Sequence, residues 1–305
     1  MSSTWKIDNI PSQKGKNILI TGANSGLGLE AATVLSQKEA TVIMAVRNLA
    51  KGQQAVDTIK SKFPNAQIDL MQLDLADLES IHSFANAFRS KYNQLHILLN
   101  NAGVMWPPHR EATKQGFESQ FGINHLGHFA LTGLLLELLK RTPNSRVVSQ
   151  SSLAHTMISK INFDDLNWEK SFDKNKAYAQ SKLANLLFTY ELDRYFKGNN
   201  IQSLAVACHP GVTATNLFRS TNRFVNWASS LIGQKVEMGT LPMLRTATEK
   251  GLEGAEYFGP AGFMGMAGYP KQVKSTVTAN DRDLAKRLWI ASEELTKISY
   301  NFAQQ

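Results

Sequence analysis

The stretch NILITGANSGLGLE, residues 17–30, decides how this chain folds. Residues 17–21 form an apolar run of strand length, a turn with Gly22, Gly26 and Gly28 follows, and a helical pattern begins at the second of these glycines. A strand, a glycine-rich turn and a helix in this order bring backbone N–H groups and the positive end of the helix to a phosphate. Glycine suits that role because a Cβ would hold a pyrophosphate off the backbone. Tight packing of the turn is the alternative explanation.

Strand-length and helix-length patterns alternate along the rest of the chain. Strands are predicted at 17–21, 41–46, 67–71, 95–99, 145–150, 201–207 and 255–258, and helices at 26–38, 50–62, 76–91, 112–140, 174–197, 238–249 and 280–297. This alternation predicts an α/β fold with right-handed βαβ crossovers. The expected architecture is a Rossmann-type, doubly wound parallel sheet of about seven strands with helices on both faces.

The 305 residues contain no internal repeat, low-complexity linker or sharp change of composition, so they predict a single domain over 1–305. Within it, 15–150 is expected to be the cofactor-binding half and 151–305 the catalytic and substrate half. The segment 212–240 is rich in aromatic residues but follows no clean period, which favours a cover over a pocket.

Composition excludes several classes of protein. Hydrophobic residues make up 43% and charged residues 19%, as in ordinary globular proteins. The one cysteine, Cys208, excludes an internal disulfide framework and a cysteine-rich metal site, and no metal is predicted. The net charge of +8 is scattered, which indicates a solvated surface that attracts anionic small molecules rather than nucleic acid.

Membrane targeting is not predicted either. The N-terminus has no apolar leader core, and the longest apolar region, Phe129 to Leu139, is interrupted by Glu137. We therefore expect no integral membrane segment and a cytoplasmic location.

Several motifs follow the first turn in a fixed order: LDLADLES at 73–80, NNAG at 100–103, GINHLGHF at 122–129, VVSQSS at 147–152, YAQSK at 178–182 and HPGVTAT at 209–215. With TGANSGLG, these motifs resemble the short-chain dehydrogenase/reductase family over about residues 15–215. A lone YxxxK carries little information, but the ordered set is specific. The resemblance implies an oxidoreductase that uses a nicotinamide dinucleotide.

The end of the second predicted strand bears on which dinucleotide is used. An acidic residue there accepts hydrogen bonds from the ribose hydroxyls of NAD, whereas a nearby arginine pairs with the 2′-phosphate of NADP. The segment TVIMAVRNLAKG has no carboxylate between Thr41 and Gly52, and Arg47 stands just after the strand. NADP(H) is therefore favoured over NAD(H). A solvated arginine with mixed cofactor use is the alternative.

The resemblance also implies a set of cofactor contacts. The first turn would hold the pyrophosphate, the residue after the third strand would lie beside the adenine ring, and the segments after the fourth and sixth strands would contact the ribose and the carboxamide. The residues concerned are Gly22, Asn24, Ser25, Gly26, Leu27, Gly28, Arg47, Asn48, Asp74, Leu75, Asn101, Ala102, Gly103, Tyr178, Lys182, Pro210, Gly211, Val212, Thr213 and Thr215.

The chemistry is expected in YAQSK, since Tyr178 and Lys182 lie on one face of a helix. Lowering the pKa of a tyrosine from about 10 to about 7 requires roughly 4 kcal/mol. One cation at roughly 4 Å supplies that energy at an effective dielectric constant of about 20. By resemblance, Tyr178 exchanges a proton with the substrate oxygen and Lys182 also holds the nicotinamide ribose.

Two further residues complete the catalytic set that the resemblance implies. Ser152 would hydrogen-bond the substrate oxygen. It is preferred over Ser151 because the serine of the family is typically followed by an apolar and then a small residue, as Ser152 is by Leu153 and Ala154. Asn124 resembles the asparagine that holds a water relaying protons to the lysine. His155 and His209 have no partner in view, so packing or exposure explains them better than acid–base chemistry.

Apolar residues near the expected pocket mouth predict an apolar aldehyde, ketone or alcohol as substrate: Met105, Trp106, Phe218 and Trp227. VRNLAKG, YAQSKLANLLF and RLWIASEELT are most similar to the branch that contains retinol dehydrogenases and light-dependent protochlorophyllide reductases. The single cysteine departs from the light-driven enzymes.

Three functions remain open at this level. The leading one is an NADP(H)-dependent enzyme that interconverts a carbonyl and an alcohol. A light-dependent or dark reductase of a conjugated double bond in a tetrapyrrole-like substrate is the second, and a non-catalytic dinucleotide-binding regulatory protein is the third. The complete catalytic set argues against the third. Helices 112–140 and 174–197 suit pairing in a homodimer or homotetramer, although packing within the chain explains them equally well.

Overall fold

One sheet of eight strands organises the computed structural model, which describes residues 4–213 and 234–302. The strands are β1 Asn17–Thr21, β2 Thr41–Val46, β3 Gln67–Gln72, β4 Ile97–Asn100, β5 Arg146–Gln150, β6 Leu204–Cys208, β7 Tyr257–Pro260 and β8 Pro270–Gln272. Their order in the sheet is β3-β2-β1-β4-β5-β6-β7-β8. The strands β1 to β7 are parallel, and β8 pairs antiparallel with β7. The Rossmann-type sheet is confirmed, with one strand more than the seven expected.

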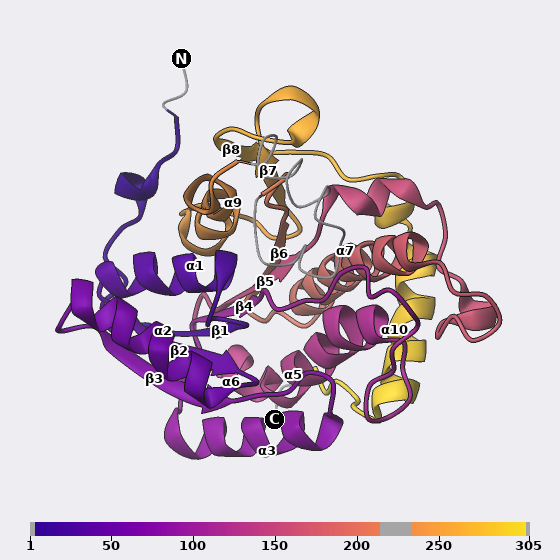
Figure 1. Ribbon diagram of the computed structural model, residues 1–305, viewed down its shortest axis with the longest axis horizontal. Helices are drawn as coiled ribbons and strands as arrows, with labels where there is room; N and C mark the ends of the chain where they lie inside the picture. Colours follow the sequence, from indigo (N-terminus) through magenta and orange to yellow (C-terminus); the bar gives the residue numbers. More distant parts are fainter. Residues whose placement is uncertain (1–3, 214–233, 303–305) are drawn as a thin grey trace.

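Helices cover both faces of this sheet (Figure 1). They are α1 Gly26–Gln37, α2 Leu49–Lys62, α3 Leu78–Lys91, α4 Ser119–Phe121, α5 Gly127–Leu134, α6 Leu136–Arg141, α7 Lys174–Gly198, α9 Val236–Thr248 and α10 Arg282–Thr296. Side chains of α1, α2 and α9 form one core with the sheet, and those of α3, α5 and α7 form the other. Helix α10 packs outside α7.

The two cores explain why the strands are apolar throughout. In β1, Ile18 and Ile20 point to the core under α1 and α2, whereas Leu19 points to the core under α3 and α5. Because successive side chains of a strand face opposite sides, a parallel strand covered on both sides has no polar face. All three residues are fully buried.

The single helix predicted over 112–140 is wrong. Residues 112–118 form a loop in which Gly116 has a φ of +86°, a left-handed conformation that an α-helix does not contain. Helix α4 begins only after Glu118, whose carboxylate accepts hydrogen bonds from the first N–H groups of that helix. A π-helical turn, Gly122–Leu126, then separates α4 from α5.

The strand order determines where a ligand can enter. Strand β1 lies between β2 and β4, so the crossovers leave β1 and β4 toward opposite faces and open a crevice at their carboxyl ends. The loops after β1, β4, β5 and β6 all begin at this edge of the sheet.

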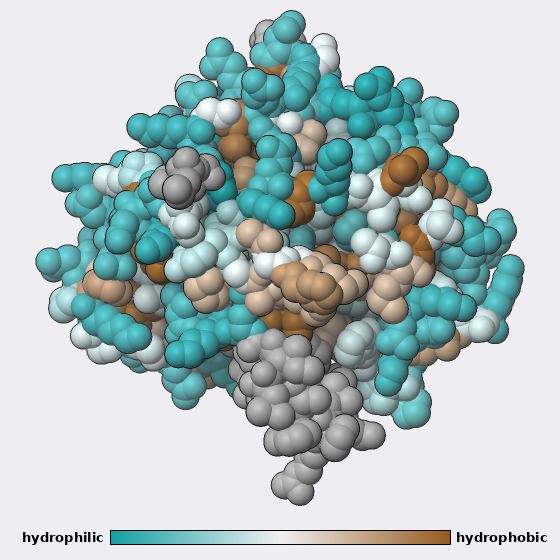
Figure 2. All heavy atoms as spheres, turned by 90° about the horizontal axis from the view of Figure 1, so that it is seen from above, coloured by the Kyte–Doolittle hydropathy of each residue, from teal (hydrophilic) through white to brown (hydrophobic). Residues whose placement is uncertain are grey.

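Hydrophilic side chains predominate on the face shown in Figure 2, with apolar side chains in small groups among them. Within the described ranges, none of the helices combines the length and the hydrophobicity that crossing a bilayer requires.

Candidate active site

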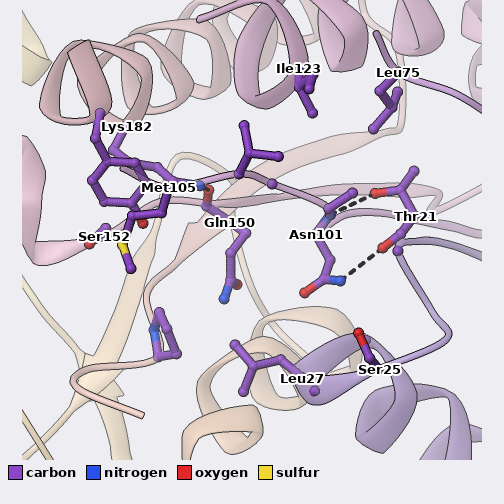
Figure 3. Close-up of a pocket in the computed structure, with 18 of the residues that line it drawn as sticks. Thr21, Ser25, Leu27, Leu75, Asn101, Met105, Ile123, Gln150, Ser152 and Lys182 are labelled. Carbon is purple, nitrogen blue, oxygen red and sulfur yellow. Dashed lines mark hydrogen bonds between the residues drawn. The ribbon is translucent and has the colours of Figure 1, made fainter. Parts of the chain in front are cut away.

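A cavity of about 680 Å³ opens at the carboxyl ends of β1, β4, β5 and β6 (Figure 3). Most of the site residues predicted from the sequence line it: Gly22, Asn24, Ser25, Gly26, Leu27, Gly28, Arg47, Asp74, Leu75, Asn101, Ala102, Gly103, Ser152, Tyr178, Lys182, Pro210, Gly211, Val212 and Thr213. Asn48 and Asn124 lie outside this lining, and Thr215 lies outside the described residues. The cavity therefore joins segments that are far apart in the sequence.

The start of α1 forms one wall of the cavity. Ser25 is the N-cap residue, but its side chain makes no capping hydrogen bond, and the first turn contains no acidic residue. The first N–H groups of α1 thus carry the positive end of the helix toward the cavity without a side-chain acceptor. This arrangement fits the pyrophosphate of a dinucleotide.

Two glycines of this turn serve the chain itself. Gly22 has a φ of +67°, which favours glycine. A Cβ on Gly28 would lie 2.4 Å from the backbone oxygen of Gly22 and 2.6 Å from Nδ2 of Asn101. Tight packing, the alternative explanation for these glycines, therefore applies to Gly28, which lets the helix pack on its own turn. Its predicted contact with a pyrophosphate stays a prediction.

The hydroxyl of Thr21 ties the loop after β4 to the end of β1. Its Oγ1 accepts hydrogen bonds from the backbone N–H groups of Asn101 and Ala102, each at 3.0 Å, and Nδ2 of Asn101 donates to the Thr21 carbonyl at 2.8 Å (Figure 3). The NNAG motif is therefore held against the glycine turn, and Asn101 contributes to this contact through both its backbone and its side chain.

His128 extends this network to the π-helical turn. Its Nδ1 lies 3.0 Å from the carbonyl oxygen of Asn124, so Nδ1 must carry the proton. Its Nε2 is then an acceptor, and the Thr21 hydroxyl, 2.9 Å away, donates to it. Burial lowers the pKa of His128 to about 4, which keeps the ring neutral at physiological pH.

The side chain of Asn124 holds the loop beside the lysine. Its Oδ1 accepts from the N–H of Val104 at 2.8 Å, and its Nδ2 donates to the Val104 carbonyl and to the Ser181 hydroxyl, both at 3.0 Å. A Cβ on Gly103 would lie 3.0 Å from Oδ1 of Asn124 and 3.7 Å from Nζ of Lys182. Asn124 thus positions the backbone that passes Lys182.

Three residues that were predicted to contact the cofactor follow β2 and β3. Arg47 is exposed, lines the cavity and forms no ion pair with a carboxylate of the described residues. Asn48 instead caps α2, since its Oδ1 accepts from the N–H of Lys51 at 2.9 Å. Asp74 lines the cavity while its Oδ1 accepts from the N–H of Ala76 at 3.0 Å.

Helix α7 carries the predicted proton-transfer pair at the opposite end. Lys182 donates from Nζ to the carbonyl oxygen of Gln150 at 3.1 Å, and Nζ lies 5.6 Å from the centroid of the Tyr178 ring. The hydroxyl of Ser152, in the loop after β5, lies beside the hydroxyl of Tyr178 and lowers the pKa of the phenol. Tyr178 and Lys182 are one helical turn apart, so both reach the cavity from the same face of α7.

Burial determines the charge of this pair. Burial raises the pKa of Tyr178 to about 12, partly offset by the neighbouring Ser152 hydroxyl, and it lowers the pKa of Lys182 to about 8. The structure thus differs from the expectation that Lys182 lowers the pKa of Tyr178 toward 7. Desolvation of the phenolate outweighs the attraction to an ammonium group at this separation, so Tyr178 carries its proton at neutral pH.

The two serines after β5 have different environments. Ser151 is buried, and its hydroxyl donates to the carbonyl oxygen of Lys182 at 2.9 Å. The hydroxyl of Ser152 accepts from the N–H of Ala154 at 3.2 Å and keeps its contact with Tyr178. Ser152 is therefore the serine whose hydroxyl lies beside the phenol.

Apolar residues form the wall beside Tyr178. Met105, Trp106 and Pro107 line the cavity after β4. Trp106 has a φ of +55°, and its N–H donates to Oε1 of the buried Gln120 at 2.9 Å. The Trp106 ring meets the Tyr178 ring edge-on, with centroids 6.2 Å apart. This backbone conformation places an indole next to the phenol.

The remaining sequence predictions fall beside or outside this wall. Phe218, Trp227 and most of the segment 212–240 lie outside the described residues. His155 and His209 are both buried, and Nδ1 of His155 donates to the carbonyl oxygen of Ser152 at 2.7 Å. The interpretation of both histidines as packing residues agrees with this burial.

Gln150 lines the cavity, although this residue of the motif VVSQSS was not predicted to belong to the site. The sequence did indicate this position. In an extended chain, residues two apart point to the same side, so Gln150 is expected to face the same way as Ser152. Thr21 and His128 gave no such signal, since their partners are distant in the sequence.

The comparisons with known proteins agree with this geometry. The family model for short chain dehydrogenases matches residues 16–226. The chain belongs to the short chain dehydrogenase family. Proteins of this family are oxidoreductases that bind a nicotinamide dinucleotide, so the predicted family and the oxidoreductase class are confirmed, whereas the preference for NADP stays a prediction.

Named relatives of this short chain dehydrogenase are retinol dehydrogenases. Retinol dehydrogenase 12 of Mus musculus is 40% identical over 290 residues, covering 94% of this chain and 88% of the relative. Retinol dehydrogenase 11 of Homo sapiens is 42% identical over 241 residues, covering 78% and 74%. The crystal structure of an uncharacterized protein from Mycobacterium paratuberculosis is 39% identical with a TM-score of 0.82, covering 98% of this chain and 100% of that one. The predicted retinol dehydrogenase-like branch is confirmed.

Proposed function

We propose that this short chain dehydrogenase is an NADP(H)-dependent carbonyl reductase that interconverts an apolar aldehyde or ketone and its alcohol. The observation that carries the proposal is the meeting of Ser152, Tyr178 and Lys182 at one end of a cavity whose other end holds the start of α1 and Arg47. The first group suits proton transfer to a carbonyl oxygen, and the second suits phosphates. One dinucleotide that spans the cavity would place its phosphates at the start of α1 and its nicotinamide beside the proton-transfer residues.

The protonation states favour reduction. The bound dinucleotide supplies the hydride. Tyr178, with its pKa raised to about 12, holds a proton that it donates to the substrate oxygen, while Ser152 hydrogen-bonds the same oxygen. The ammonium of Lys182 lies beside the phenol and stabilises the phenolate that remains after transfer. In the oxidation direction Tyr178 acts as the base.

Cofactor preference follows from Arg47. Arg47 lines the cavity, and its guanidinium has no carboxylate partner among the described residues, which leaves its donors for the 2′-phosphate of NADP. In this proposal residues 15–150 form the cofactor-binding half, with Asp74 and Leu75 near the adenine and Asn101 to Gly103 near the ribose. Residues 151–305 supply the catalytic and substrate half.

The substrate class follows from the apolar wall and from the relatives. Met105, Trp106 and Pro107 offer no charge to the substrate beside Tyr178. Because the named relatives are retinol dehydrogenases, isoprenoid aldehydes and alcohols belong among the first compounds to test. Asn124 acts in this scheme through the loop that it holds beside Lys182.

The test is NADPH consumption in the dark with medium-chain, aromatic and isoprenoid aldehydes and ketones. Tyr178→Phe removes only the hydroxyl, so we expect a loss of turnover of about a hundredfold or more with NADPH binding retained. Turnover that survives this substitution would refute the proton-donor role. Turnover that requires light would instead support the tetrapyrrole-type reductase, and NADPH binding without turnover would support the regulatory protein.

Three further expectations stay predictions: a cytoplasmic location, a homodimer or homotetramer, and the absence of nucleic-acid binding. Cell fractionation, light scattering and a gel-shift assay check them in turn.

A further inference from the structure

Gln150 occupies a buried position at the chemical end of the cavity. It is the last residue of β5 and is only 7% exposed. Its backbone oxygen accepts hydrogen bonds from Nζ of Lys182 at 3.1 Å and from Nδ2 of Asn185 at 3.0 Å. The side chain of Gln150 makes none of these backbone contacts. It projects from the strand into the cavity between Ser152 and Asn101 (Figure 3).

A neighbouring thiol fixes which end of this amide faces the cavity. Cys208 is paired with Gln150 across β5 and β6, and its Sγ donates to Oε1 of Gln150 at 3.0 Å. Burial raises the pKa of Cys208, so the thiol keeps its proton and remains a donor. With Oε1 engaged, Nε2 is the end of the amide that is left for a ligand.

Nε2 donates no hydrogen bond to an acceptor among residues 4–213 and 234–302, and it is not one of the fully buried polar atoms without a partner, so it faces the open cavity. A ligand that fills this part of the cavity removes water from Nε2. Unless the ligand provides an acceptor, the covered donor then costs about 1 to 3 kcal/mol. Its position beside Ser152 and Lys182 indicates a ligand group near the reacting atoms rather than the adenosine end of the cavity.

If the cavity binds NADP(H) as proposed, the carboxamide oxygen of the nicotinamide is an acceptor for Nε2 of Gln150, and its strength depends on the redox state of the ring. In a reduced nicotinamide the lone pair of the ring nitrogen delocalises through the ring double bond onto the carboxamide oxygen, which becomes a stronger acceptor. In the oxidised form the ring is a cation, which withdraws electron density from that oxygen and repels the positive end of an N–H dipole. Both effects favour the reduced form beside Nε2.

We propose that Gln150 binds the nicotinamide end of the dinucleotide through Nε2 and thereby makes the site prefer NADPH over NADP⁺. The inference rests on the proposed function, because it requires that this cavity binds NADP(H). It assigns to Gln150 a preference for one redox state, whereas Arg47 distinguishes NADP from NAD.

The experiment measures the dissociation constants of NADPH and NADP⁺ for wild type and Gln150→Met. NADPH is titrated by its own emission, and NADP⁺ by displacement of NADPH, at one pH below the pKa of Lys182, which is about 8. Both forms carry the same phosphates and adenosine, so the ratio of the two constants reports on the nicotinamide alone. We expect the preference for NADPH to fall about two- to tenfold, the worth of one net hydrogen bond.

Two further variants sharpen the result. In Gln150→Glu a carboxylate repels the phosphates of both forms equally but attracts the oxidised ring, so the preference for NADPH should fall further than in Gln150→Met. In Cys208→Ala the amide loses the donor that orients it, so the preference should fall by less. Circular dichroism shows whether each variant folds. If Gln150→Met does not fold, Cys208→Ala still tests the inference.

The matched control is Gln67→Met. Gln67 is an exposed residue at the start of the edge strand β3, away from the carboxyl ends where the cavity opens. The ratio of the NADPH and NADP⁺ dissociation constants in Gln67→Met should therefore equal that of wild type. A wild-type ratio in both Gln150→Met and Cys208→Ala would overturn the inference, whether both constants weaken equally or neither changes. A wild type that binds neither dinucleotide would refute the proposed function itself.

Discussion

Lys182 and Tyr178 share one buried environment, and desolvation moves their pKa values in opposite directions. The pKa of Lys182 falls to about 8 and that of Tyr178 rises to about 12. The proposed carbonyl reduction requires that the phenol of Tyr178 is protonated and that the ammonium of Lys182 is charged. Across the physiological range the lysine is therefore the group of the pair that titrates.

We expect kcat/KM for carbonyl reduction to fall as the pH rises through about 8, because Lys182 then loses its charge. Lys182→Arg is the control, since a guanidinium stays charged over this range. A pH profile of NADPH oxidation checks the prediction. If the same fall persists in Lys182→Arg, another group is responsible.

Arg47 supports a second prediction at this scale. Arg47→Ala should weaken NADPH binding by about tenfold or more and leave NADH binding nearly unchanged, because a charge-assisted hydrogen bond to the 2′-phosphate is lost. Arg47→Lys should give an intermediate value, since it keeps the charge without the planar fork. Equal losses for NADPH and NADH would assign Arg47 to another part of the cofactor.

Residues of the site differ in how far the sequence reveals them. Ser152, Tyr178 and Lys182 stand in short motifs whose positions at a strand end and on a helix face follow from the fold. Thr21 and His128 could not be predicted, because their hydrogen bond joins positions 107 residues apart. No local pattern encodes such a contact.

The turn between β1 and α1 yields a prediction at the level of elements. Gly28→Ala should lower the free energy of unfolding by about 1 to 3 kcal/mol, because its Cβ would collide with the backbone oxygen of Gly22. Gly198→Ala is the matched control. Gly198 ends α7 with no neighbour within 4 Å of an added Cβ, so stability should stay the same or rise by less than about 1 kcal/mol. Urea denaturation of both variants provides the comparison.

Element prediction succeeded where periodicity was long and failed where it was interrupted. The predicted helix 174–197 matches α7, because its apolar pattern runs without a break. The predicted helix 112–140 fails because Gly116 and the π-helical turn interrupt an apolar stretch that looks continuous. Strand β8 has only three residues and starts with Pro270, which is too short for any period.

Buried histidines link the stability of the whole molecule to pH. Burial lowers the pKa of His125 to about 3 and those of His128 and His209 to about 4, from an ordinary value of 6.5. Below pH 6.5 the unfolded chain therefore binds protons that the folded chain does not, so stability is lost as the pH falls toward about 4.

These three protons predict a slope of up to about 4 kcal/mol per pH unit in the free energy of unfolding. His125→Gln should reduce this slope by about 1.4 kcal/mol per pH unit, since one titrating group is removed. Denaturation curves between pH 7 and pH 4 check both values. An unchanged slope in His125→Gln would contradict the assignment.

The burial of α7 has a consequence for how the protein evolves. Every residue of this helix from Ala177 to Asp193 is buried, with the sheet on one side and α10 on the other, so the amides of this segment should exchange with deuterium only when the whole domain unfolds. The helix cannot change its sequence freely without loss of folding. Given the proposed function, we expect new substrates to be gained through the loops that carry Trp106 and Leu153, while the geometry of Tyr178 and Lys182 on α7 is kept.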